Sequence, residues 1–128
     1  MASLDQLMAL PGALAAFEFR GSGELLGHKS SDAEVLTAEV LDMLAHMCAA
    51  NVSIATMQAR GWENMTQLKG YYPVREFTLL GLEWSVVVSG LQREAPKAEG
   101  KDYLPPFLGV VLNNTTADYE ATYKALEG

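Results

Sequence analysis

The residues that could perform chemistry are few and stand apart. The chain has two histidines, His28 and His46, and a single cysteine, Cys48. His46 follows Asp42 by four residues, a spacing that on a helix produces a surface contact between the two side chains. His28 closes an expected strand and is predicted to be a surface residue and not a ligand, and a metal site at His46 would need further ligands that cannot be placed. One cysteine also excludes an intramolecular disulfide and a zinc site with two thiolates.

Two other candidates also have simpler explanations. No basic residue stands at helical spacing from Cys48, so we expect a small buried apolar side chain and no reactive thiolate. The glycines of Gly21-Ser22-Gly23 could form a phosphate loop, but they join two expected strands and predict a hairpin turn. Catalysis needs a nucleophile beside a base, paired carboxylates or a metal cluster, and no such set is found. We therefore predict a protein that is not an enzyme and that uses no cofactor or metal.

Composition narrows the classes of partner. The 128 residues suit one domain spanning the whole chain. A net charge of −7 with nine Lys and Arg residues argues against nucleic acid, because phosphate neutralisation needs clustered cations. The sequence has no run of ~18 apolar residues, so we expect no membrane span, and we see no signal peptide. The single cysteine fits a reducing compartment, so we expect a cytoplasmic protein.

Hydrophobic patterns and capping signals predict three helices and five strands. Ser31-Asp32-Ala33-Glu34 matches a capping box that would start a long helix, and Gly61 would end that helix. A polar loop with three prolines is expected over 92–106. The expected helices cover 4–10, 31–59 and a segment capped by Thr115 or Thr116 and ending near 126. The expected strands cover 13–19, 24–29, 71–80, 83–89 and 107–112.

Polarity separates interior strands from edge strands. The strand 107–112 is apolar on both faces, and the strand 13–19 carries only Glu18 as a polar residue. Such strands are covered on both sides and belong inside a sheet. The strands 24–29 and 71–80 carry charged residues, which suit sheet edges. We therefore expect the first, fourth and fifth strands inside and the second and third at the edges.

The long helix has two apolar stripes at helical spacing. The first consists of Leu36, Val40, Met43, Met47, Ala50, Ile54 and Met57. The second consists of Leu41, Ala45, Cys48, Val52, Ala55 and Ala59. Together they span an arc of roughly 200°, whereas a helix lying on a sheet needs an arc of little over 100°. One stripe can cover the sheet, and either the 92–106 loop or a second copy of the protein must cover the other; we favour the second copy.

The segment 7–30, LMALPGALAAFEFRGSGELLGHKS, resembles the opening of the roadblock/LC7 family. Family patterns read Leu-x-x-Leu-x-Gly-Val near the first turn, and here Leu7, Leu10, Gly12 and Ala13 fill those places. The resemblance covers the chain in element order. It implies an α/β (α+β), profilin-like fold: a five-stranded antiparallel sheet of order 2-1-5-4-3, with one long helix on one face and two terminal helices on the other. The 92–106 loop and the frequent methionines indicate a divergent prokaryotic branch.

The resemblance also implies a homodimer formed through the long helix and the edge strand after it. The candidates for a dimer or partner interface are therefore Leu36, Val40, Met43, Met47, Ile54, Met57, Leu41, Ala45, Cys48, Val52, Val74, Glu76 and Thr78. Relatives in the family regulate small GTPases, so a small GTPase or a signalling protein is the expected partner. We predict a non-catalytic adaptor that binds itself and another protein. The alternative is a sensor that holds a small molecule between sheet and helix, where Ala45, Ala55 and Ala59 would leave room.

Overall fold

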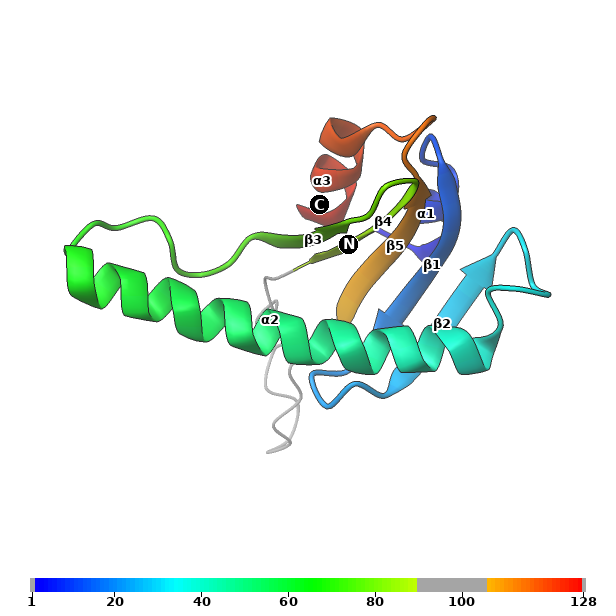
Figure 1. Cartoon of the computed structure of the whole chain (residues 1–128). Helices are drawn as coiled ribbons and strands as arrows, with labels where there is room; N and C mark the ends of the chain where they lie inside the picture. Colours follow the sequence, from blue (N-terminus) through cyan, green and yellow to red (C-terminus); the bar gives the residue numbers. More distant parts are fainter. Residues whose placement is uncertain (1, 90–105, 128) are drawn as a thin grey trace.

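A computed structural model describes residues 2–89 and 106–127 (Figure 1). Its elements are α1 (Leu4–Met8), β1 (Ala13–Phe19), β2 (Leu25–Ser30), α2 (Ala38–Thr66), β3 (Glu76–Leu80), β4 (Trp84–Ser89), β5 (Phe107–Asn113) and α3 (Tyr119–Glu127). The strands form one antiparallel sheet of order β2-β1-β5-β4-β3. The expected strand order is thereby confirmed, with the charged strands β2 and β3 at the edges. All of the 92–106 loop except Pro106 lies outside the described residues.

Two apolar layers hold the sheet between its helices. On one face α2 packs over a core that contains Phe17, Phe19 and Phe107, whose rings stack at centroid distances of 5.6 and 5.4 Å. On the other face α1 and α3 cover a second core built around Leu7 and Val110. Figure 1 shows α2 on one side of the sheet and both short helices on the other. This layering confirms the expected fold class.

The turn between β1 and β2 is the hairpin that Gly21-Ser22-Gly23 predicts. The Gly23 N–H donates to the Arg20 carbonyl at 2.8 Å, and the Arg20 N–H donates to the Glu24 carbonyl at 2.9 Å. Gly23 has a φ of +98°, and a Cβ there would lie 2.7 Å from the ring of His46 on α2. Glycine is needed both for the backbone conformation and for the close approach to the helix.

The start of α2 differs from the prediction. Thr37 caps the helix by accepting the Val40 N–H at 3.2 Å, so the helix begins at Ala38 and not at residue 31. The Ser31 N–H and hydroxyl both donate to the Leu14 carbonyl, at 2.8 and 3.0 Å, which holds Ser31 against β1 in a turn before the helix. The Asp32 carboxylate accepts the Val35 N–H and forms a separate turn. The capping-box prediction was wrong, because Ser31 and Asp32 form a turn beside β1 and the helix begins only after Thr37.

The end of α2 also differs. The helix continues through Gly61 to Thr66, and Gln67 ends it in the left-handed region at φ 58°. Glycine inside a helix costs only about 1 kcal/mol relative to alanine, and the helix-forming neighbours of Gly61 outweigh that cost. The following strand begins at Glu76 and not at residue 71. Residues 67–75 form the return loop between α2 and β3 instead.

Smaller differences occur at the two short helices. Helix α1 ends at Met8, two residues before the expected end. Helix α3 begins at Tyr119, where the Asp118 carboxylate accepts the Ala121 N–H at 3.0 Å. Neither Thr115 nor Thr116 caps it, because Asp118 stands closer to the first turn.

A chain of hydrogen bonds ties α3 to β4 and to the turn before β4. The Tyr119 hydroxyl lies 2.9 Å from the hydroxyl of buried Ser85 and donates to the Asn114 side-chain oxygen at 2.9 Å. The Asn114 amide in turn donates to the Gly81 carbonyl at 2.9 Å. The Tyr119 hydroxyl is therefore the central member of the chain.

We expect Tyr119→Phe to lower the free energy of unfolding by about 1–2 kcal/mol, because buried Ser85 loses its partner. Urea unfolding followed by circular dichroism measures the change. Tyr123→Phe is the matched control, since its hydroxyl contacts Thr78 at a longer 3.3 Å and its loss should cost less. Equal effects of the two substitutions would contradict the central role of Tyr119.

Candidate interaction surface

The structure decides which apolar stripe of α2 faces the sheet. Leu41, Ala45, Cys48 and Val52 are at most 4% exposed and pack into the core that α2 shares with the sheet. These four interface candidates are therefore core residues of the chain itself. Ala59 is buried with them.

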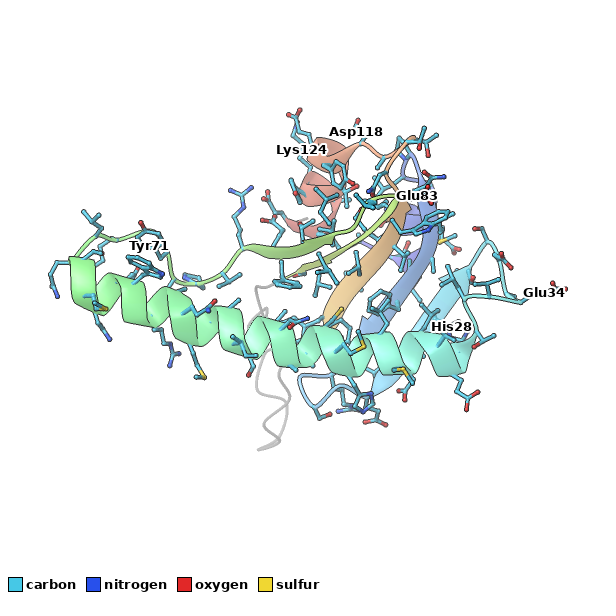
Figure 2. All side chains as sticks on the ribbon, viewed as in Figure 1. His28, Glu34, Tyr71, Glu83, Asp118 and Lys124 are labelled. Carbon is cyan, nitrogen blue, oxygen red and sulfur yellow. The ribbon has the colours of Figure 1, made fainter. Side chains whose placement is uncertain are left out.

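The other stripe lies on the side of α2 that points away from the sheet, where Figure 2 shows side chains projecting outward. Its members Val40, Met43, Met47, Ile54 and Met57 are 45–70% exposed. We call these five residues, together with exposed Ala50, the outer stripe. Leu36, which precedes the helix, is half-buried against the core and is not part of it.

Helix α2 is much longer than the sheet is wide. Its 29 residues span about 43 Å at 1.5 Å per residue, whereas five strands ~4.8 Å apart span roughly 19 Å from the first to the last. In Figure 1 the C-terminal part of α2 projects beyond β3. Trp62 and Met65 on this projecting part are 56% and 85% exposed. The end of the helix therefore has apolar side chains and no sheet beneath it.

The sheet face under α2 is not fully covered near the turn between β3 and β4. Leu79 on β3 and Trp84 on β4 are 50% and 53% exposed, and they share a pocket of about 220 Å³ with Leu44 of α2. We call Leu44, Leu79 and Trp84 the open patch. Trp84 also lines a larger neighbouring pocket of about 520 Å³ that reaches Val35 before α2. The open patch continues the helix-bearing face of the sheet toward the β3 edge.

The sequence pattern does not single out Leu79, Trp84 or Trp62 as interface residues. The alternation of Trp84 with Ser85 indicates which face of the strand carries the tryptophan. It does not indicate that this part of the face is uncovered. Trp62 lies beyond the expected end of the helix and so belongs to neither predicted stripe. The sequence signal that could have identified these residues is the run of large apolar residues beside the charged edge strand.

The outer edge of β3 has no partner strand among the described residues. At its start, Arg75 pairs with Glu76 and with Glu127 of α3. Burial, and next a hydrogen bond with the Glu127 carboxyl, raise the pKa of Glu76, while the two carboxylates raise the pKa of Arg75. Of the three interface candidates here, Thr78 contacts Tyr123 of α3, Glu76 is held in this cluster, and half-buried Val74 precedes the strand. The cluster anchors β3 to α3 and leaves the strand edge free.

The return loop folds against the projecting end of α2. The Arg60 guanidinium donates to the Tyr72 hydroxyl at 2.8 Å and lies 4.6 Å from the centre of its ring. Tyr71, labelled in Figure 2, stacks on Trp62 at 6.2 Å. Backbone hydrogen bonds from Gly70 and Tyr72 lower the pKa of the Glu63 carboxyl. The aromatic residues of the loop thus brace the helix end.

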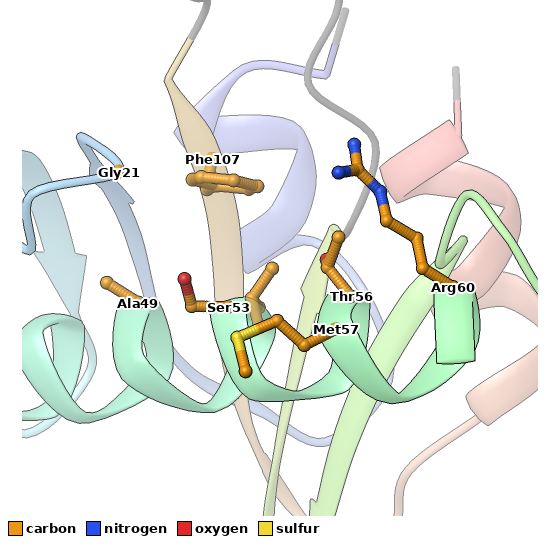
Figure 3. Close-up of a pocket in the computed structure, with 8 residues that line it drawn as sticks. Gly21, Ala49, Ser53, Thr56, Met57, Arg60 and Phe107 are labelled. Carbon is orange, nitrogen blue, oxygen red and sulfur yellow. The ribbon is translucent and has the colours of Figure 1, made fainter. Parts of the chain in front are cut away.

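A pocket of about 290 Å³ lies on the flank of α2 opposite the open patch (Figure 3). Ser53, Thr56 and Arg60 line it from the helix, Gly21 from the hairpin and Phe107 from β5. Among the described residues that line it, the polar side chains lie on the helix and none pairs a nucleophile with a base. This arrangement gives the pocket no evident chemistry.

The two histidines and the cysteine are exposed or buried as the sequence predicts. His46 Nδ1 is 2.7 Å from the Asp42 carbonyl oxygen on the exposed surface of α2, and His28 is exposed on β2. Both predicted surface roles are confirmed. No group of three or more His, Cys, Asp or Glu residues within 2–89 and 106–127 is placed to hold a metal ion. Cys48 is buried, as predicted, and burial raises the pKa of its thiol to about 12.

We expect the Cys48 thiol to react with a disulfide reagent at pH 8 at least about 1,000-fold more slowly in the folded protein than in urea, because the thiolate is the reactive form. Since the folded pKa is the higher one, this thiol stabilises the fold below the unfolded pKa of ~8.5. That contribution is lost as the pH rises toward the folded value of about 12. Fast reaction of the native protein would show that Cys48 is accessible.

Helix α2 is the one helix in the described ranges that is long and apolar enough to cross a membrane by length and composition. Core helices can meet the same criterion. Here one apolar stripe packs into the sheet core, so the fold accounts for part of this apolar character. The outer stripe accounts for the rest.

Comparisons with known proteins agree with this architecture. A family model described as an uncharacterized conserved protein (DUF2173) matches residues 3–93. No curated protein matches the sequence. An MglB structure described as having a tetrameric arrangement is 19% identical, with a TM-score of 0.63 over 97% of this chain and 85% of that chain.

Two further solved structures are similar. The roadblock/LC7 domain from Streptomyces avermitilis is 14% identical, with a TM-score of 0.62 over 96% of this chain and 84% of that chain. The gliding protein MglB from Thermus thermophilus is 20% identical, with a TM-score of 0.61 over 97% and 82%. At such identities the likeness shows the fold alone, and it confirms the fold that residues 7–30 indicate.

Proposed function

The chain belongs to the DUF2173 family of uncharacterized conserved proteins and has the roadblock/LC7 fold, and on this basis we propose that it is a non-catalytic, homodimeric protein-interaction domain. The observation that carries the proposal is the unpaired β3 edge beside the open patch of Leu44, Leu79 and Trp84, within the described part of the chain. A free strand edge beside exposed apolar side chains is a site where a second chain gains both backbone hydrogen bonds and apolar contact.

A second copy fits both features at once. Antiparallel pairing of β3 with the same strand of another copy places a two-fold axis at the strand edge. The projecting end of each α2 then extends over the other copy, where it can cover the open patch. The length of α2 relative to the sheet supports this arrangement, since the exposed Trp62 lies beyond its own sheet.

The family resemblance and the net charge together support a protein as the partner of the dimer. Roadblock relatives regulate small GTPases, and two of the similar structures are MglB proteins, one in a tetrameric arrangement. We assign a small GTPase or another signalling protein as the partner, bound through the paired helices. The net charge of −7 argues against nucleic acid. A single domain and a cytoplasmic location remain predictions from the sequence.

Light scattering and sedimentation at micromolar concentration test the proposal. A mass of twice 13.9 kDa, or a multiple of it, is expected. Cross-linking in cells followed by mass spectrometry should then capture a partner in wild type and lose it in a monomeric variant. A protein that stays monomeric throughout the micromolar range would contradict the proposal.

The sensor alternative has one supporting feature. Of the small residues expected to leave room, Ala45 and Ala59 are buried and Ala55 is half-buried. The pocket of about 520 Å³ instead lies beside Trp84 and is lined mainly by apolar residues, and its size suits a small ligand. Native mass spectrometry separates the two functions. A ligand retained at fixed stoichiometry favours the sensor, and a bare dimer mass favours the adaptor.

A further inference from the structure

The pocket of about 520 Å³ lies on the helix-bearing face of the sheet, between Trp84 and the turn that precedes α2. Leu14 of β1 and Val111 of β5 line it from the sheet. Val35 and Leu36 line it from the turn. It adjoins the open patch, because Trp84 and Val111 also line the smaller pocket there. All five of these residues are apolar, and a cavity of this size accommodates a small molecule.

The turn that forms one wall of this pocket is fixed by hydrogen bonds of the chain itself. The Ser31 N–H and hydroxyl hold its start against the Leu14 carbonyl, at 2.8 and 3.0 Å. The Leu36 N–H donates to the Asp32 carbonyl at 2.8 Å, and the Leu36 side chain packs against the core beneath α2. A pocket whose walls are already ordered binds a ligand without the entropic cost of ordering them.

Asp32 is the one charged side chain among the described residues that line the pocket. Its Oδ1 atom accepts the Glu34 and Val35 N–H groups, both at 3.3 Å. Its Oδ2 atom accepts no hydrogen bond from the described part of the chain. This oxygen is therefore available to a positively charged donor. The Trp84 ring in the same pocket is a second group that attracts cations, through the negative potential of its face.

The chain around the pocket carries acidic residues and no cation. The pocket is built from four stretches of sequence without any Lys or Arg, namely 1–19, 30–59, 76–89 and 106–123. Of the cations next to these stretches, Lys29 and Arg75 pair with Asp5 of α1 and Glu127 of α3, on the other side of the sheet. The electrostatic potential at the pocket therefore favours a positive ligand and disfavours a negative one.

We propose that this pocket binds a small molecule with an apolar body and one protonated amine, with the body against Trp84 and Leu36 and the amine at Asp32. A carboxylate or phosphate ligand would meet Asp32 without any counter-ion and is the wrong class. The proposal rests on the sensor function named above as the alternative, and it states the class of the ligand. The β3-edge dimer is independent of it, because a single chain supplies the pocket.

Three probes with the same body and different charges test the ligand class: phenylbutylamine, phenylbutanol and phenylbutyrate. Titration of the isotope-labelled full chain, followed by amide NMR shifts, gives each dissociation constant and locates the site. We expect the amine to bind at least about tenfold more tightly than the butyrate, with the alcohol between them. The largest shifts should occur at Val35, Leu36 and the Trp84 indole N–H. Equal affinities of the three probes, or shifts centred on another surface, would overturn the proposal.

The Asp32→Asn variant removes the charge and keeps an oxygen that can accept the Glu34 and Val35 N–H groups. Phenylbutylamine should bind this variant about three- to fivefold more weakly, and phenylbutanol should bind it as tightly as wild type. Glu34→Gln is the matched control, because the Glu34 side chain projects away from the fold in Figure 2 and is not among the described residues that line the pocket. Trp84→Leu should weaken all three probes at least about threefold. Equal effects of Asp32→Asn and Glu34→Gln on the amine would contradict the role of Asp32.

Sedimentation of the same samples separates this proposal from the β3-edge dimer. If the protein is monomeric and the amine binds as expected, the ligand site stands and the edge dimer fails. If wild type is dimeric and binds no probe, while a monomeric Leu79→Glu variant binds phenylbutanol, a second copy covers the pocket. The ligand proposal is then overturned and the edge dimer stands. Failure of every probe in both proteins also overturns the ligand proposal and leaves the dimer unaffected.

Discussion

Replacing Leu79 by glutamate is expected to turn the proposed dimer into a monomer, with a dissociation constant raised at least about 100-fold. Leu79 lies on β3 and is half-exposed on the helix-bearing face of the sheet, where it shares a pocket with Leu44 and Trp84. Dimerisation through the β3 edge would bury this side chain, and an unpaired carboxylate buried there costs several kcal/mol. Since about 1.4 kcal/mol corresponds to a tenfold change, a loss of about 100-fold is a conservative expectation.

Sedimentation equilibrium across the micromolar range measures this change. Leu82→Glu is the matched control, because Leu82 is fully exposed at the turn after β3 and lies beyond the paired strand. The melting temperature of both variants should stay near that of wild type, which separates lost association from lost folding. A Leu79→Glu protein that keeps the wild-type dissociation constant would show that the dimer does not form at this edge.

Replacing Gly109 by alanine is expected to destabilise the fold by about 3 kcal/mol. Gly109 lies opposite Phe17 on adjacent strands, and a Cβ at Gly109 would stand 2.4 Å from the Phe17 ring. Both residues are in the interior of the sheet, and Phe17 is fully buried. The ring therefore occupies the space that a side chain on β5 would need, and overpacking of this kind typically costs about 1–3 kcal/mol.

A double-mutant cycle tests whether the ring is the cause. Urea unfolding of Phe17→Leu, Gly109→Ala and the double variant gives the coupling energy, and we expect the alanine to cost less when the ring is gone. Gly61→Ala is the matched control, because a Cβ added at this position of α2 would meet only open space. It should stabilise the protein by up to about 1 kcal/mol. Equal costs of Gly109→Ala in both backgrounds would exclude the Phe17 contact as the cause.

The two edge strands could be predicted from polarity, because a sheet covered on both faces cannot accept charges in its centre; the full strand order came from the family resemblance. Glu24, His28 and Lys29 indicated an edge position for the second strand, and Arg75 and Glu76 did so for the third. Both edges are where the structure places them. The hairpin at Gly21-Ser22-Gly23 could be predicted for a similar local reason, since few residues other than glycine adopt a positive φ.

The limits of α2 could not be predicted because they depend on contacts from elsewhere in the chain. Ser31 has the sequence of a helix cap, but its hydroxyl bonds to Leu14 on β1. Gly61 resembles a helix end, but the helix continues, and contacts of Arg60 and Glu63 with the return loop brace the part that follows. Local signals compete with tertiary hydrogen bonds at such positions, and here the tertiary bonds are decisive.

The sequence by itself determined the number and order of the elements, the lack of any recognisable catalytic set, and the presence of two apolar stripes on one helix. Only the tertiary structure decided that Leu41, Ala45, Cys48 and Val52 face the sheet and that the methionines face outward. The physical reason is that helical periodicity records which residues share a face, whereas the choice of face depends on fit. The small residues that face the sheet let α2 lie close to its aromatic core, and the bulky methionines therefore lie on the outer side of the helix.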